Sequence, residues 1–152
     1  MLFSKMMDFF LPMKIPSVTH QEKRIAVRGG KPVVYEDGRL KDARQKFFAY
    51  LAPHAPEKPM EGAVYLRIVW CYQESWRHPA GTYKTTKPDT DNLVKLFKDC
   101  MTAAGFWKDD AQVALELTEK KYWKFPGIHV AVGEISEAAD DGGQKEADTG
   151  AD

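Results

Sequence analysis

The sequence predicts a small α+β domain in which helices pack on one mixed β-sheet. Its 152 residues suit a single domain with a buried core, and the proportions of 43% apolar and 29% charged residues are typical of a globular chain. Strand and helix patterns follow one another in the order strand, helix, strand, helix, strand, strand. This order favours a mixed sheet with helices packed on it. No apolar run reaches the roughly 18 residues of a membrane span, so none is predicted.

The first half of the chain predicts a strand, a long loop and a helix. Residues 8–15, DFFLPMKI, have the composition of a strand. Residues 16–32 predict a loop that turns at a Gly-Gly pair, and the VVY that follows predicts a short strand. Residues 39–51 predict a helix, because apolar residues recur there near helical spacing. These apolar residues are Leu40, Phe47, Phe48 and Leu51.

The second half predicts three strands and one more helix. Residues 62–73 are apolar on both faces of a strand, which indicates a central position in the sheet. Residues 90–104 predict a helix, and Gly105 is well placed to end it. Its apolar face, at steps of three and four, consists of Leu93, Leu96, Phe97, Cys100, Met101 and Ala104. Residues 112–123 and 127–135 predict the last two strands.

The charge of the chain is unevenly distributed, although its net value is zero. Residues 136–152 contain six acids and one lysine, with no aromatic or branched apolar residue, which predicts a disordered acidic tail. Residues 1–135 contain 21 bases and 16 acids, and they are predicted to form the folded domain. A mildly basic domain permits a nucleic-acid partner without requiring one.

Several other residue types are predicted to be structural. Cys71 and Cys100 lie far apart, with no CxxC, which indicates thiols in a reducing compartment. Trp70 and Trp107 lie in apolar patterns, which favours core packing over stacking on nucleic-acid bases. The histidines have no metal-ligand spacing and are His20, His54, His78 and His129.

Acidic residues stand at both ends of the second predicted helix. Asp89 is a natural N-cap and Asp91 a favourable acid in the first turn. Lys95 has an acid one turn away, and an exposed ion pair of this kind contributes only about 0.3–0.5 kcal/mol. Asp109 and Asp110 follow the helix, where a negative charge opposes the helix dipole. Capping therefore accounts poorly for the whole set.

A metal site is the alternative explanation for these acids. Phe106 and Trp107 are expected to be buried and to anchor the turn that carries the second pair of acids. If the next strand runs back alongside the helix, its first residues would lie near a helix start, in this chain or in a partner. Carboxylates that share a site repel one another unless a cation joins them. Oxygen ligands without histidine or cysteine favour magnesium or manganese over zinc.

The segments DTDNLVK at 89–95 and GFWKDDAQV at 105–113 resemble the RusA family of Holliday junction resolvases. The family pattern is an aspartate, one residue, Asp-Asn-Leu and a lysine, then a helix, Gly-Phe and an Asp-Asp-x-Gln turn. Weaker similarity extends over most of residues 1–135 and implies a RusA-like fold. The segment IPSVTHQEKR departs from the family, whose best-known form has an asparagine-rich loop led by Pro-Pro at this place.

The resemblance implies roles for individual residues. It makes Asp89, Asp91, Lys95 and Asp110 catalytic, and the three aspartates ligands of Mg²⁺, with Mn²⁺ as a substitute. Asp109 is implied to be an outer acid or a turn cap. Asn92 and Gln112 are implied to orient their neighbours.

The resemblance also implies a function. The chain would be a homodimeric endodeoxyribonuclease that resolves Holliday junctions by paired phosphodiester hydrolysis, in DNA recombination and repair. Its partner would be branched DNA, and its location the cytoplasm of a bacterium, from a chromosomal or prophage gene. Two other classes stay open: a catalytically silent branched-DNA-binding protein of the same fold, and an interaction protein whose acids only cap helices. Cleavage of a synthetic junction with and without magnesium separates the three.

Overall fold

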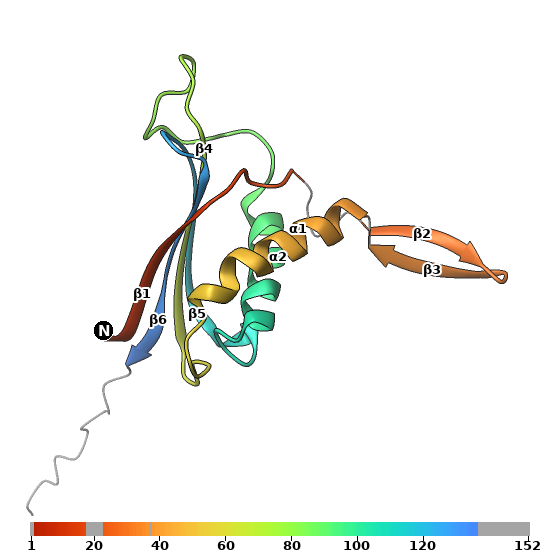
Figure 1. Ribbon diagram of the computed structural model, residues 1–152, viewed down its shortest axis with the longest axis horizontal. Helices are drawn as coiled ribbons and strands as arrows, with labels where there is room; N and C mark the ends of the chain where they lie inside the picture. The colour runs from red at the N-terminus through yellow and green to blue at the C-terminus, as the bar shows by residue number, and fades with distance from the viewer. Residues whose placement is uncertain (1, 18–22, 37, 137–152) are drawn as a thin grey trace, which may run out of the picture.

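The computed structural model describes residues 2–17, 23–36 and 38–136 and confirms the α+β class (Figure 1). The strands are β1 (Leu2–Pro12), β2 (Lys23–Arg28), β3 (Lys31–Glu36), β4 (Val64–Gln73), β5 (Val113–Trp123) and β6 (Gly127–Ser136). The helices are α1 (Gly38–Leu51) and α2 (Thr90–Ala104), with short 3₁₀ helices η1 (Ala52–His54) and η2 (Asp110–Gln112). Residues 137–152 of the predicted acidic tail lie outside the described residues. No described helix is long and apolar enough to cross a membrane.

The main sheet has four strands in the order β1-β6-β4-β5. β6 pairs antiparallel with both β1 and β4, whereas β4 and β5 are parallel, so the sheet is mixed. The predicted central position of β4 is confirmed. Both faces of β4 hold buried apolar residues, with Trp70 on the face toward the helices and Val69 on the opposite face.

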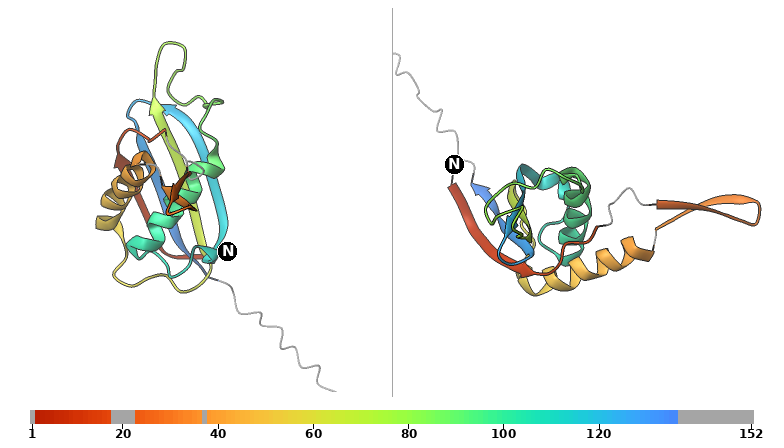
Figure 2. Two further views of the ribbon diagram at one scale, coloured as in Figure 1. Left: turned by 90° about the vertical axis from the view of Figure 1, so that its right-hand side faces the viewer. Right: turned by 90° about the horizontal axis from the view of Figure 1, so that it is seen from above.

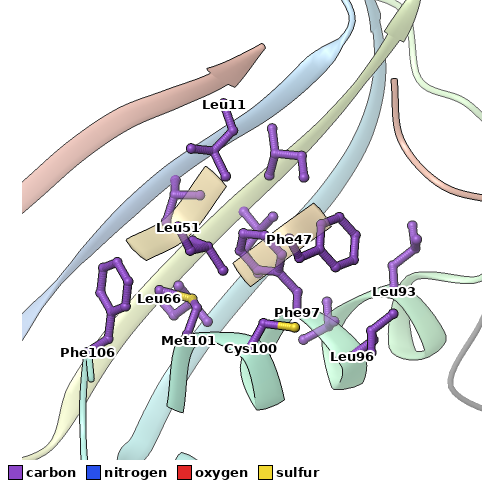
Figure 3. Close-up of a cluster of buried hydrophobic side chains, with 14 of the residues drawn as sticks. Leu11, Phe47, Leu51, Leu66, Leu93, Leu96, Phe97, Cys100, Met101 and Phe106 are labelled. Carbon is purple, nitrogen blue, oxygen red and sulfur yellow. The ribbon is translucent and has the colours of Figure 1, made fainter. Parts of the chain in front are cut away.

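Both helices pack on one face of this sheet and enclose the core (Figures 1 and 2). Phe97 from α2 makes edge-on ring contacts with Phe47 from α1, at 5.2 Å between centroids, and with Trp70 from β4, at 5.3 Å. Figure 3 shows Phe47 and Phe97 together in this cluster. Trp70 and Trp107 are fully buried, which confirms their predicted place in the core. Trp70 contacts the rings of Phe47 from α1 and Phe97 from α2, and so connects both helices to β4.

The N-terminal region differs from the sequence prediction in two ways. Most of the predicted loop 16–32 is a β-hairpin, since β2 pairs antiparallel with β3. Gly29 and Gly30, with φ of 58° and 75°, form the tight turn that joins these strands. The first strand begins at Leu2, because β1 also pairs with the end of β6. A register shift after Ser4 interrupts the alternation of β1, and this hides its first half from a period-two pattern.

Candidate active site

The start of α2 presents two carboxylates that do not cap the helix. Asp89 occupies the N-cap position with extended backbone (φ −71°, ψ 146°), but its side chain makes no capping hydrogen bond. Lys87 Nζ instead donates to both carboxylate oxygens of Asp89, at 2.9 and 3.0 Å. Asp91 is exposed in the first turn and has no hydrogen-bond or ion-pair partner among the described residues. The N-cap prediction for Asp89 is therefore right in position and wrong in bonding.

Lys120 on β5 supports the segment that leads into this helix. Its Nζ donates to the carbonyl oxygens of Thr86 at 2.7 Å and Pro88 at 2.8 Å. Burial, and then the nearby charge of Lys84, lower the pKa of Lys120 below its usual range. Sequence reasoning missed this residue, because the contact joins segments more than thirty positions apart and no local pattern signals it. The backbone immediately before Asp89 is held by a partly desolvated ammonium group.

The turn after α2 is fixed by Gln112 and Asp109. The Gln112 side chain accepts from the backbone N–H groups of Lys108 and Asp109 at 3.0 and 3.1 Å. Its amide nitrogen donates to the carbonyl oxygens of Met60 and Gly62, at 2.8 and 3.1 Å. The Asp109 carboxylate accepts from the backbone N–H of Ala111 at 2.9 Å and caps η2. Of its two expected roles, Asp109 fills that of turn cap, and Gln112 orients its neighbours.

The aromatic residues that precede this turn are buried, as the sequence predicts. Gly105 ends α2 in the left-handed conformation, with φ of 91°, and both Phe106 and Trp107 enter the core. Trp107 Nε1 donates to Thr102 Oγ1 at 2.8 Å, which ties the turn back to the helix. The backbone N–H of Met60 donates to the carbonyl oxygen of Phe106 at 2.9 Å. Asp110 therefore follows an anchored segment.

Lys95 connects the helix to this turn. Its Nζ lies 3.3 Å from Asp99 Oδ1 and 3.3 Å from Asp110 Oδ2. The hydrogen bond to Asp99, together with the charges of Asp99 and Asp110, raises the pKa of Lys95 above its usual range. Lys95 is therefore a cation at neutral pH. Its ion pairs are with Asp99 and Asp110, whereas Asp91, one helical turn away, has no partner within residues 2–17, 23–36 and 38–136.

β5 runs back along α2, as the metal-site hypothesis requires. Lys98 of α2 pairs with Glu116 of β5 at 3.0 Å, and Lys120 reaches the carbonyl oxygen of Pro88 just before the helix. Asp110 precedes β5 and lies beside the middle of α2. The structure thus places Asp110 with Lys95, and it places Asp89 near the other end of β5.

The donor chemistry of the site fits a hard divalent cation. Every candidate ligand is a carboxylate oxygen, the type that Mg²⁺ and Mn²⁺ prefer. Asp89 and Asp110 each contact a lysine ammonium group, so both carboxylates already lie beside a positive charge. Among the residues that the structure describes, no three histidine, cysteine or acidic side chains form a group that could hold a metal ion. The carboxylates therefore match Mg²⁺ and Mn²⁺ in the type of ligand atom. Asp89 and Asp91 lie at the start of α2, and Asp110 lies beside Lys95.

Comparison with known proteins gives one family match and two relatives. The family described as Endodeoxyribonuclease RusA matches residues 14–133. The Crossover junction endodeoxyribonuclease rusA of Lactococcus phage r1t is 30% identical over 102 residues, which cover 66% of this chain and 76% of that protein. The uncharacterized protein YqaN of Bacillus subtilis (strain 168) is 28% identical over 131 residues, which cover 78% of this chain and 91% of that protein. The family match includes all four predicted catalytic residues.

Proposed function

Because this chain belongs to the RusA family of endodeoxyribonucleases, we propose that it resolves Holliday junctions by paired phosphodiester hydrolysis, in DNA recombination and repair. The observation that carries the proposal is the arrangement of acids around α2. Asp89 sits at the N-cap without capping, and Asp91 has no partner among the described residues. Asp110 lies on an anchored turn beside Lys95. A helix that only needed stabilising would use its N-cap carboxylate.

We assign Asp89, Asp91 and Asp110 as the residues that would hold Mg²⁺, with Mn²⁺ as a substitute. A bound divalent ion supplies charge that neutralises the phosphate and a water of lowered pKa. Lys95 would stabilise negative charge on the phosphate or on the leaving oxygen, and its charged, half-exposed ammonium group supports this role. Asp99 keeps this ammonium group in position through its ion pair.

The direct test is cleavage of a synthetic four-way junction by the purified full chain. We expect nicks in two strands of like polarity when Mg²⁺ is present, and none when EDTA replaces it. A catalytically silent branched-DNA-binding protein would bind the junction and leave it intact in both conditions. An interaction protein would neither bind nor cut it. The proposed nuclease activity is rejected if the junction stays intact with Mg²⁺ and with Mn²⁺.

We propose a homodimer as the active form, because cutting two strands of like polarity suits a two-fold enzyme. The sheet face opposite the helices supports this proposal. It exposes Phe10, Leu117 and Trp123. It also carries an ionic cluster in which the Glu119 carboxylate contacts Arg67 at 2.8 Å and Lys121 at 2.9 Å. A surface with exposed apolar residues and charges of both signs can bind the same surface of a second copy of the chain.

Replacing Leu117 with lysine is expected to convert the dimer into a monomer. Leu117 is 49% exposed on the open sheet face, and a charge there would be buried in a face-to-face dimer. Phe48→Lys is the matched control, because Phe48 is 42% exposed on helix α1. Light scattering after size exclusion gives the mass, and circular dichroism checks the fold. A folded Leu117→Lys variant with the mass of a dimer would place the interface elsewhere.

Replacing Lys120 with methionine is expected to slow junction cleavage by about 10-fold to 10²-fold. A rate loss of this size is expected when a group at the reaction centre, here Asp89, is displaced slightly. Methionine keeps an unbranched apolar chain but loses the two hydrogen bonds to the carbonyl oxygens of Thr86 and Pro88. Asp89 follows directly, so the Mg²⁺ concentration for half-maximal rate should rise, while junction affinity is kept.

Lys58→Met is the matched control, because Lys58 is an exposed lysine outside α2, β5 and the open sheet face. Lys120→Arg should restore part of the rate, since arginine supplies donors of different shape. An unchanged Mg²⁺ dependence in Lys120→Met would remove the positioning role.

A further inference from the structure

The hairpin of β2 and β3 stands apart from the rest of the fold. The two strands form a separate two-stranded sheet. Figure 1 shows the hairpin extending beyond the start of α1, away from the main sheet, and the right-hand view of Figure 2 agrees with this placement. An isolated two-stranded hairpin is only marginally stable in water. A projecting element of this kind calls for a partner that covers it.

The register of the hairpin separates an apolar face from a basic tip. Val27 lies opposite Pro32, and Ile25 follows two positions away on the same face. Ile25 and Val27 are 71% and 73% exposed, far more than branched apolar residues usually are. On the other face Arg28 lies directly opposite Lys31, next to the Gly-Gly turn. Like charges directly across a strand pair are unfavourable, so this pair favours a site for an anion.

We propose that this hairpin holds the branch point of a DNA junction, with Arg28 and Lys31 on phosphates and the face of Ile25 and Val27 against exposed base pairs. The inference rests on the proposed function, which supplies branched DNA, and it adds a binding site outside the acids of α2. Charge complementarity favours DNA, because a basic pair at the tip matches the phosphate backbone. Apolar side chains also insert between base steps where DNA is bent or unstacked. A branch point exposes such base-pair surface, whereas continuous duplex does not.

The test compares two double variants of the full chain in binding assays with EDTA present, so that no strand is cut. The probes are a synthetic four-way junction and a linear duplex of the same arm sequence, each measured over a series of salt concentrations. Arg28→Ala with Lys31→Ala should weaken binding to both DNAs and reduce the slope of log affinity against log salt by about 2. Ile25→Ser with Val27→Ser should reduce the preference for junction over duplex by about tenfold, with the salt slope unchanged.

Matched controls come from exposed residues of the same types elsewhere in the fold. Lys58→Ala removes an exposed base, and Phe125→Ser removes an apolar side chain that is 68% exposed. Neither should alter affinity, salt slope or junction preference. The hairpin proposal is overturned if both double variants keep the wild-type salt slope and junction preference. Conversion of either double variant to a monomer also overturns it, because the hairpin would then contact a second copy of the chain.

Cleavage with Mg²⁺ is scored separately from binding. A wild-type chain that binds the junction but never cuts it rejects the nuclease and leaves the hairpin result standing. A wild-type chain that binds neither DNA rejects both.

Discussion

Asp91→Asn is expected to abolish junction cleavage, a loss of about 10³-fold or more, while junction affinity is kept or slightly increased. Asparagine has the size of aspartate but lacks the charge that a divalent ion requires. Such an ion contributes several kcal/mol of transition-state stabilisation, and each 1.36 kcal/mol is tenfold in rate. Asp91 is exposed, without a partner among the described residues, so its loss disturbs little else. The charge of Asp91 in the first turn of α2 interacts favourably with the helix dipole by about 0.3–1 kcal/mol. Its loss should lower the free energy of unfolding by no more than that.

The measurement is single-turnover cleavage over a range of Mg²⁺ concentrations, with affinity measured in EDTA. Asp89→Asn and Asp110→Asn should behave like Asp91→Asn. Asp109→Asn is the matched control, because Asp109 adjoins Asp110 but caps η2. An asparagine cap keeps an oxygen acceptor, so that variant should retain most of the rate. Wild-type cleavage by Asp91→Asn would remove the metal-site hypothesis.

Lys95→Ala is expected to slow junction cleavage by about 10²-fold or more, which is the scale for removing one transition-state donor. The structure sharpens this prediction, because Lys95 contacts Asp110 as well as Asp99. A lysine that served only as a surface ion pair would cost about 0.3–0.5 kcal/mol of stability and leave the rate unchanged. Lys95→Arg should rescue in part, since a planar guanidinium replaces a compact point charge.

The matched control for Lys95 is Lys98→Ala. Lys98 lies one turn away on the same helix and also forms an ion pair, with Glu116. Loss of its charge should leave the cleavage rate within about twofold, because its ion-pair partner is Glu116 and not one of the three aspartates. If Lys95→Ala and Lys98→Ala show equal rates at saturating Mg²⁺, then Lys95 is a structural lysine and the three aspartates act without it.

Most of the fold was predictable because its elements carry local signals. The bounds of α2 follow from an apolar face at helical spacing and from Gly105, whose φ of 91° makes it an effective helix end. β4 is apolar on both faces and is central in the sheet. β3 contains the short strand predicted at residues 33–35, whereas β2 lies where the sequence predicts a loop, because its apolar residues Ile25 and Val27 are exposed and no core demands them. The Gly-Gly turn between the two strands was the available signal.

The candidate site was predictable in its residues more than in its geometry. The motif placed the acids at both ends of α2, and the structure shows that Asp89 does not cap and that Lys95 contacts Asp110. Lys120 was not predictable, because its partners are backbone carbonyl groups contributed by a distant segment. The catalytic roles of Asp89, Asp91, Lys95 and Asp110 stay predictions.

The strand order of the main sheet has a consequence for the synthesis of the chain on the ribosome. β6 is the last of the described strands to be made, yet it lies between β1 and β4. The sheet therefore cannot close until residues 127–136 have left the exit tunnel, and until then β1 has no partner strand in it. Pairings between segments so distant in sequence form slowly, and unpaired strand edges promote aggregation. A message truncated before β6 would thus yield an unpaired β1 and an open β4 edge in place of a smaller working enzyme.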